Sequence, residues 1–486
     1  MEKVKVSPIY ILNIAITLFL MFGLKFLPPV LGLQALGMAV LGVFFGMLYG
    51  WVTLNTYIWP CLAGILALQL TGYNTMNSIL ASGFGNNVIP FLMMILVYVI
   101  FLEKAGMCSR IANWFLAQKV VVGHPWILVI FIFLSAYVMG ICTYSYPAML
   151  VPWAISYAIC EEAGYKKGEK FPALLIIGVA VAAFAGYTAL PIKATAVLVL
   201  GLLDSTTEGL YAVSFFEYSV FMIPMTLLSM FIYVALMRFV FKADVSKLTG
   251  INNSKFVSAS KAPMSKMERA AFVSMIAFIL MMCIPTVLPQ SWAITKLFKG
   301  WGMNGPLFIV LVALAIYLID GKNAFNFTKV ANSGSVNWDV IIMTACCFAV
   351  AAAVENDEVG IMDVISTYVN PILENLSPSL FIVMAFVVMA VATQFMHNLV
   401  LASVMTPLIV KFGLVVGANP IILTIFLTYA FSIAMVTPAA SGVAALTYSN
   451  DWAPNHLCYQ SLIIHFILST VLILLIFIPI GLLLYV

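Results

Sequence analysis

Runs of about 20 apolar residues recur along the whole chain, and they constrain its fold more than any other feature. A helix of about that length crosses the hydrocarbon core of a bilayer. The 486 residues are 64% hydrophobic and only 8% charged, whereas soluble domains carry about 25% charged residues. We therefore predict an all-α polytopic membrane protein. The apolar windows lie near residues 8–27, 31–51, 54–71, 88–103, 172–204, 217–241, 271–289, 304–320, 337–354, 419–449 and 458–485.

Four apolar stretches are interrupted by polar, glycine or proline residues. Two of them, 126–160 and 377–413, are long enough to turn back on themselves, and we interpret them as re-entrant hairpins. Two others, 172–204 and 419–449, are interpreted as broken helices. With the hairpins returning to their starting side, about 11 transmembrane helices remain.

The distribution of basic residues predicts the orientation of the chain. Of 22 lysines and arginines, 17 fall on one side, four on the other, and Lys193 lies within a span. By the positive-inside rule the richer side is cytoplasmic, and it includes the N-terminus. The first apolar stretch is too long for a signal peptide and lacks a cleavage site, so we expect an uncleaved span. We expect a multi-pass protein of the cell membrane.

The composition argues against several classes of function. The eight cysteines show no CxxC spacing and there are only four histidines, so neither a metal cluster nor a disulfide framework is expected. Basic residues are scattered, which gives no sign of nucleic-acid binding. A membrane-embedded enzyme would need a nucleophile with a base, or a metal. Only His397 lies near hydroxyls, without an acidic partner, so we do not expect an enzyme or a cofactor.

The two halves repeat the same features in the same order. Each half has a glycine after its opening helix, then a hairpin that ends at a proline, then a broken helix that contains another proline. The paired landmarks are Gly106 and Gly360, Pro152 and Pro407, and Pro191 and Pro438. An odd number of crossings per unit gives the copies opposite orientation. Paired broken segments in inverted repeats indicate a substrate site near the midplane.

These patterns divide the chain into six parts. The two inverted repeats are the regions in which the hairpins and broken helices occur, and the polar, basic segment between the halves is expected to be a cytoplasmic loop. The expected parts are N-terminal spans at 1–87, a first repeat at 88–241, the loop at 242–270, connecting spans at 271–336, a second repeat at 337–457 and a C-terminal span at 458–486.

Lys193 lies in an apolar run where a cation costs about 2.5–3.5 kcal/mol on insertion scales. Gly186 and Pro191 break the helix just before it. A buried charge in a broken helix is typical of the anion sites of transporters. The alternative is a lysine that extends its side chain to the membrane interface.

Four segments of the chain together resemble the divalent anion/sodium symporter family, the di- and tricarboxylate carriers of the wider ion-transporter superfamily. The segments are 99–116, 336–361, 393–409 and 431–446. The resemblance implies a homodimer, with a scaffold that includes the N-terminal spans and a transport part that moves like an elevator. It also implies a small organic dianion, such as a C4-dicarboxylate, bound at the two hairpin tips.

At the second tip, Asn398 stands nine residues before Pro407, as the family pattern requires. Its amide can donate to a carboxylate. The neighbouring His397 can donate to an anion or carry a proton, although a neighbouring carbonyl could equally satisfy it. At the first tip, the hydroxyls of Thr143, Tyr144 and Ser145 can bind an anion or cap the broken helix ends, and the repeat selects Thr143 among them.

The family resemblance also implies roles for Thr195 and Ser441, which stand where its Thr-Pro-Pro motifs are degraded. It implies a sodium site at Thr393 and Asn398, although Thr393 could be an ordinary hydroxyl bonded within its helix. The first sodium site lacks the matching hydroxyl, and we expect the Lys193 ammonium to replace that ion.

Coupling to sodium, coupling to protons and anion exchange therefore all stay open. The alternative substrate is an inorganic anion such as sulfate, or the chain is an ion antiporter of the same superfamily. A cation antiporter usually buries an acidic residue, and no acidic residue lies in either hairpin tip or at the break of either broken helix.

Overall fold

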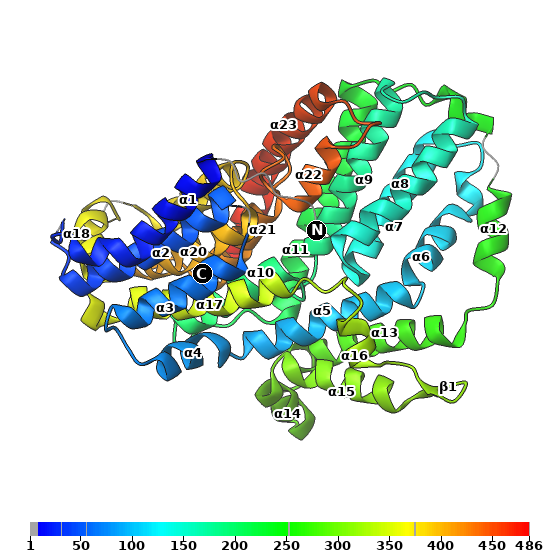
Figure 1. Cartoon of the computed structure of the whole chain (residues 1–486). Helices are drawn as coiled ribbons and strands as arrows, with labels where there is room; N and C mark the ends of the chain where they lie inside the picture. Colours follow the sequence, from blue (N-terminus) through cyan, green and yellow to red (C-terminus); the bar gives the residue numbers. More distant parts are fainter. Residues whose placement is uncertain (1–7, 31, 55, 251–252, 374–375, 486) are drawn as a thin grey trace.

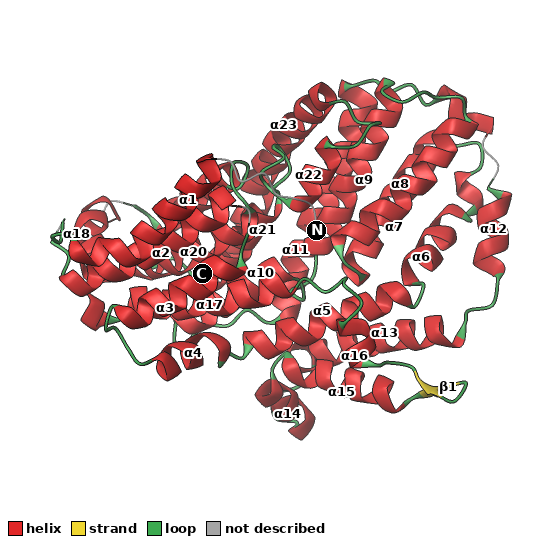
Figure 2. Ribbon diagram, viewed as in Figure 1, coloured by secondary structure: helices red, strands yellow, loops and turns green. Residues whose placement is uncertain are grey.

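The computed structural model describes residues 8–485 except 31, 55, 251–252 and 374–375. Most of the described chain is helical, as Figure 2 shows. Its only strands are β1 (Leu318–Ile319) and β2 (Lys322–Asn323), which pair antiparallel in a short hairpin. The all-α class predicted from the apolar windows is confirmed.

The helices fall into four consecutive groups (Figure 1). The N-terminal group is α1 (Pro8–Leu18), α2 (Ala35–Leu54), α3 (Ile58–Leu70) and α4 (Met76–Phe84). The first unit is α5 (Val88–Lys104), α6 (Met107–Leu116), α7 (Pro125–Cys142), α8 (Ser145–Glu162), α9 (Lys170–Thr188), α10 (Ala194–Thr206) and α11 (Phe215–Ala235). The connecting group is α12 (Ser254–Lys261), α13 (Lys266–Val287), α14 (Ala293–Trp301), α15 (Asn304–Ile316) and α16 (Phe327–Ala331).

The second unit follows the order of the first. It is α17 (Trp338–Glu355), α18 (Ile361–Leu373), α19 (Pro378–Ala392), α20 (Asn398–Val415), α21 (Pro420–Ser432), α22 (Gly442–Tyr448) and α23 (Asn455–Leu472), and α24 (Ile478–Leu484) ends the chain. In each unit two helices form a hairpin and the next two are separated by an unwound segment. These pairs are α7/α8 and α9/α10 in the first unit, and α19/α20 and α21/α22 in the second.

Within the described residues, nine helices are long and apolar enough to cross a membrane, or 11 if two bent pairs each count as one span. The bent pairs are α4 with α5, at 49°, and α14 with α15, at 92°. The larger of these totals equals the number of spans expected from the sequence, but the helices that make it up are not all the expected ones. The hairpin arms α7 and α20 qualify, whereas α3 and α21 have only 13 residues. At 1.5 Å per residue such a helix is about 20 Å long, short of the roughly 30 Å hydrocarbon core.

Helix α9 is the central helix of the first unit, and nearly all of its side chains are buried. It packs against α7, α8, α11 and α23. Glycines permit the closest of these approaches, because a Cβ at Gly186 would collide with the main chain of Tyr137, and one at Gly140 with that of Ala183. Hairpin α7/α8 is thereby held directly against the helix that breaks before Lys193.

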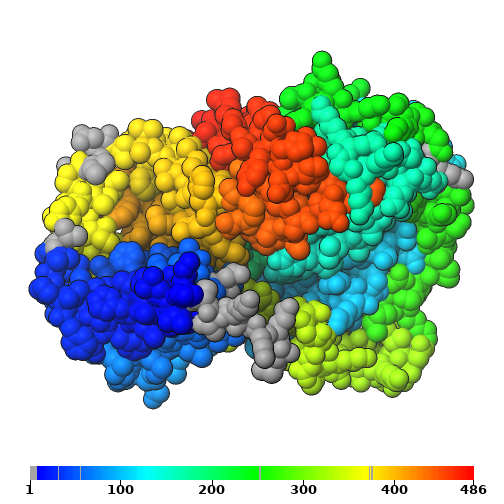
Figure 3. Space-filling model, turned by 45° about the horizontal axis from the view of Figure 1, so that its top comes forward, coloured from blue at the N-terminus to red at the C-terminus, as the bar shows by residue number. Residues whose placement is uncertain are grey.

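The two units interlock instead of lying side by side. Helix α10 packs against α20 and α21, and α22 packs against α9. The space-filling view shows the blue N-terminal helices against the yellow part of the second unit, and the orange-red C-terminal part against the teal hairpin of the first (Figure 3). There Asn450 donates to the Tyr157 hydroxyl at 2.6 Å, and the rings of Tyr157 and Trp452 stack.

The polar segment 242–270 is tied to α6 by two side chains, Arg110 and Asn253, and Asn253 donates to the carbonyl of Leu116 at 3.3 Å. Arg110 pairs with Glu268 at 3.2 Å and donates to the carbonyl of Ala262 at 2.9 Å. Within this segment, the Ser246 main-chain N–H donates to Asp244 at 2.9 Å, which lowers the pKa of that carboxyl. The segment is therefore anchored to the first unit through part of its length.

Candidate functional site

A polar cavity lies where both hairpin tips and both unwound segments meet. It offers about 80 Å³ to the centres of water molecules, and one water needs about 10–15 Å³ by this measure. The cavity therefore has room for a small anion in place of several waters. Its lining residues are Tyr57, Tyr144, Ser145, Tyr146, Phe184, Tyr187, Thr195, Asn337, Val340, Met343, His397, Asn398, Leu399, Ser441, Gly442 and Val443.

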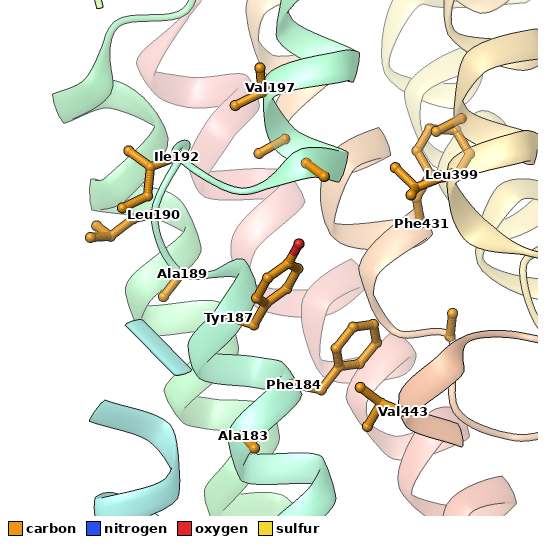
Figure 4. Packing of buried hydrophobic residues seen from close by; sticks show 14 of the residues in the cluster. Ala183, Phe184, Tyr187, Ala189, Leu190, Ile192, Val197, Leu399, Phe431 and Val443 are labelled. Atoms are coloured by element: carbon orange, nitrogen blue, oxygen red, sulfur yellow. The ribbon is translucent and has the colours of Figure 1, made fainter. Parts of the chain in front are cut away.

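The two units contribute opposite walls of this cavity. Phe184 of α9 points toward Val443 at the start of α22 (Figure 4), and both side chains line the cavity. Tyr144 and Thr195 belong to the first unit, and Asn398 to the second. The structure thus brings together residues that are more than 200 positions apart in the sequence.

Four of the helices that begin at the cavity wall belong to the two hairpins and the two broken helices. They are α8 at Ser145, α10 at Ala194, α20 at Asn398 and α22 at Gly442, and a residue at or next to each start lines the cavity. A helix N-terminus carries roughly half a positive charge and free main-chain N–H groups. No lysine or arginine is among the described lining residues, so these helix ends are the main positive feature of the wall. This arrangement favours an anion.

At the first tip, the structure separates the two predicted residues. Tyr144 lines the cavity, and its ring lies 5.4 Å from that of Tyr187. Thr143 is fully buried outside the lining, and its hydroxyl donates to the carbonyl of Met139 at 2.8 Å. Thr143 therefore holds the end of α7, and it presents its carbonyl to another group.

Lys193 is the partner of the Thr143 carbonyl. It is only 3% exposed and immediately precedes α10. Its Nζ donates to the Thr143 carbonyl at 2.6 Å, and it lies 5.6 Å from the centroid of the Tyr187 ring. Lys193 is not among the residues that line the cavity. The ammonium lies behind the wall, next to a tyrosine that forms part of it.

At the second tip, both predicted residues line the cavity. The Nδ1 atom of His397 is buried and has no hydrogen-bond partner within the described chain, and its ring lies 5.9 Å from that of Tyr57. The main-chain N–H of Asn398 donates to Ala440 O at 3.2 Å, and its Oδ1 accepts from Leu399 N at 2.9 Å. The Nδ2 group of Asn398 has no acceptor among the described residues and remains available to a ligand.

Thr195 and Ser441 both line the cavity, but their hydroxyls differ. The Thr195 hydroxyl makes no hydrogen bond to the described part of the chain. The Ser441 hydroxyl accepts from Ala444 N at 3.2 Å and donates to Ala434 O at 2.7 Å, so it caps α22 and closes the unwound segment. Thr195 is the freer of the two to bind a ligand.

Thr393, expected as a sodium ligand, is buried and does not line the cavity. Its hydroxyl donates to the carbonyl of Phe431 at 3.3 Å. The Oδ1 atom of Asn398, the other expected ligand, already accepts a hydrogen bond. A sodium ion needs several oxygen ligands, so it would also require main-chain carbonyls near Thr393 and Asn398.

Eleven of the sixteen lining residues did not figure among the predicted site residues, and six of these eleven have polar or aromatic side chains: Tyr57, Ser145, Tyr146, Phe184, Tyr187 and Asn337. Tyr146 has a signal in the sequence, because it belongs to the first tip. Asn337 directly precedes α17 and Tyr57 directly precedes α3, and nothing in the pattern of either segment indicates a site.

A second, larger cavity of about 290 Å³ lies between α2, α17, α18 and α20. Its wall is almost entirely apolar, apart from Glu355 and Lys411. It contains no hairpin tip and offers few groups to an anion, so the smaller polar cavity is the candidate site.

A helical membrane fold with paired broken helices around a polar cavity defines a secondary transporter of the anion type. Residues 51–430, most of the chain, match the model of the CitMHS citrate transporter family, and the chain belongs to that family. It is a transporter and not an enzyme. The comparison with curated proteins finds no match.

Solved structures of two transporters share the fold. The Alcanivorax borkumensis YdaH transporter is 13% identical, with a TM-score of 0.56, over 83% of this chain and 88% of that one. Neisseria gonorrhoeae MtrF, described with a class of antimetabolite efflux pumps, is 12% identical, with a TM-score of 0.55, over 83% of each chain. At these identities the likeness concerns the fold alone.

Proposed function

We propose that this protein carries small organic carboxylates, C4-dicarboxylates or related di- and tricarboxylates, bound in the cavity between the two hairpin tips. The observation that carries the proposal is the convergence of four helix N-termini on one polar cavity. Carboxylates accept hydrogen bonds from such N–H groups and are favoured by the dipoles. The family's description as citrate transporters supports the same class of substrate.

The side chains of the cavity complete this proposed site. Asn398 donates through Nδ2, His397 through a ring N–H, and Tyr144 and Thr195 through their hydroxyls. Lys193 balances part of the negative charge from behind the wall. Because its ammonium is covalently fixed and already bonded to a tip carbonyl, it takes the place of a bound cation at the first tip.

We further propose an elevator movement, in which the two hairpins and broken helices travel as one body against a scaffold that includes the N-terminal helices of a homodimer. The interlocking of α10 with α20 and α21 supports a single moving body. Sodium, protons or a counter-transported anion would drive the movement, with sodium bound near Thr393 and Asn398 in the first case.

The test is uptake of radiolabelled succinate and citrate into proteoliposomes, with the sodium gradient, the proton gradient and internal dicarboxylate varied separately. Asn398→Asp places a carboxylate in the cavity and should abolish uptake by charge repulsion. Asn113→Asp, the same change on α6, is the matched control. No carboxylate uptake under any driving force would refute the proposal, and sulfate uptake would replace it with an inorganic anion carrier.

A further inference from the structure

Gln394 lies in the tip between α19 and α20 and is only 2% exposed. Its Nε2 donates to Ala390 O at 2.9 Å and to Ile433 O at 3.1 Å. Its Oε1 accepts from Met435 N at 3.2 Å and from Val436 N at 3.0 Å. A carboxamide has two donor hydrogens and two acceptor lone pairs, and every one of them is used.

Three of these four bonds reach the unwound segment between α21 and α22. Non-helical backbone at membrane depth must find its hydrogen-bond partners within the protein. The Gln394 side chain supplies partners for Ile433, Met435 and Val436, although Met435 N also donates to Ile433 O at 3.0 Å. The main-chain carbonyl of Gln394 accepts from the Thr437 hydroxyl. One side chain thus satisfies much of the unwound segment.

The junction made by Gln394 joins the two parts of the second unit that line the cavity. Asn398 lies four residues after it on the tip, and Ser441 lies five residues after Val436 on the unwound segment. Gln394 itself does not line the cavity, and its carboxamide has no group left for a ligand. Any effect of Gln394 on anion binding must therefore act through the distance between the second hairpin tip and the unwound segment.

We infer that Gln394 is a positioning residue, which sets the distance between the second hairpin tip and the unwound segment and thereby the affinity for the transported anion. The inference rests on the proposed function, because it concerns the same cavity. A displacement of about 1 Å in a binding group costs up to about 100-fold in a reaction that depends on it.

Two variants separate hydrogen bonding from packing. Gln394→Glu keeps the shape and both acceptor positions but turns an oxygen toward the carbonyls of Ala390 and Ile433. Gln394→Leu keeps most of the volume and removes every bond. Gln118→Glu is the matched control, because Gln118 also follows the end of a helix and donates to the carbonyl four residues before it, that of Trp114, but does not line the cavity.

We expect both Gln394 variants to raise the KM for radiolabelled succinate about 10- to 100-fold in proteoliposomes, with little change in Vmax. Lowering the pH protonates the introduced glutamate, and its new O–H can donate to Ile433 O again. The Glu variant should therefore recover relative to wild type at low pH, whereas the Leu variant should not. A wild-type KM in both variants overturns the inference. The inference is also overturned if uptake by the Glu and Leu variants depends on pH in the same way.

Other titratable groups near this junction are His397 on the same tip, Tyr429 on α21, Tyr448 on α22 and His465 on α23, which lines a cavity with Ile433 and Val436. They are unchanged in both variants, so the ratio of variant to wild-type uptake at each pH isolates residue 394.

Hydrogen exchange gives a readout that needs no substrate. The main-chain amides of Met435 and Val436 should exchange faster in Gln394→Leu than in wild type, measured by mass spectrometry on the reconstituted protein. Unchanged exchange overturns the inference, as does faster exchange with an unchanged KM. If wild-type protein takes up no carboxylate, the proposed function fails, and the exchange rates alone then decide whether Gln394 fixes the junction.

Discussion

Replacing Lys193 with methionine removes a buried cation next to the cavity while keeping an unbranched side chain. The Nζ atom lies 5.6 Å from the Tyr187 ring, which lines the cavity, so an anion against that ring lies within roughly 10 Å of it. At an effective dielectric constant of about 20, one negative charge at that distance gains about 1.7 kcal/mol. A dianion gains about twice as much, or roughly a 200-fold change in affinity before salt screening.

The fold should survive this change because two terms offset each other. Losing the hydrogen bond to Thr143 O costs about 1.5–3 kcal/mol, whereas removing a cation from membrane depth recovers about 2.5–3.5 kcal/mol. Lys193→Met should therefore elute as folded protein in size-exclusion chromatography, like the control Lys119→Met, a lysine that is exposed and far from the cavity.

The assay is the concentration dependence of uptake in proteoliposomes, for succinate and for succinamate, its monoanionic amide. We expect the KM of Lys193→Met for succinate to rise between tenfold and 200-fold, and its KM for succinamate to rise by roughly the square root of that factor. An unchanged KM would refute a charge-balancing role for Lys193. Equal increases for the two substrates would show that the loss is structural and not electrostatic.

Three further changes test the cavity and its support. His397→Gln should raise KM about tenfold, because a hydrogen bond to a charged ligand is worth about 1.5–3 kcal/mol; an unchanged KM would mean that the unpartnered Nδ1 does not serve the substrate. Gly186→Val should abolish folded protein in fluorescence-detected chromatography, because the new side chain collides with the main chain of Tyr137. Arg110→Met removes the ion pair with Glu268 and should lower the apparent Tm in detergent by about 2–5 °C without changing KM; a shifted KM would link α6 to the cavity.

The interruptions in the apolar pattern predicted part of the lining of the candidate cavity without any structure. A run of apolar residues must be helical in a bilayer, so a polar cluster within it predicts a break. By this route Tyr144, His397 and Asn398 were predicted, and all three line the cavity. The repeat placed Thr143 at the site and the family resemblance placed Thr393 there, but the structure turns both hydroxyls to carbonyls outside the cavity lining.

The sequence by itself determined the class of the protein, because the bilayer requires long apolar helices whatever they pack against. The tertiary structure decided which breaks face one another, and that Tyr57 and Asn337 from distant segments complete the wall. It also decided that Lys193 bonds to a tip carbonyl and that Gln394 joins the second tip to its unwound segment. These contacts depend on how closely helices approach across the fold, and local hydropathy carries no information about that distance.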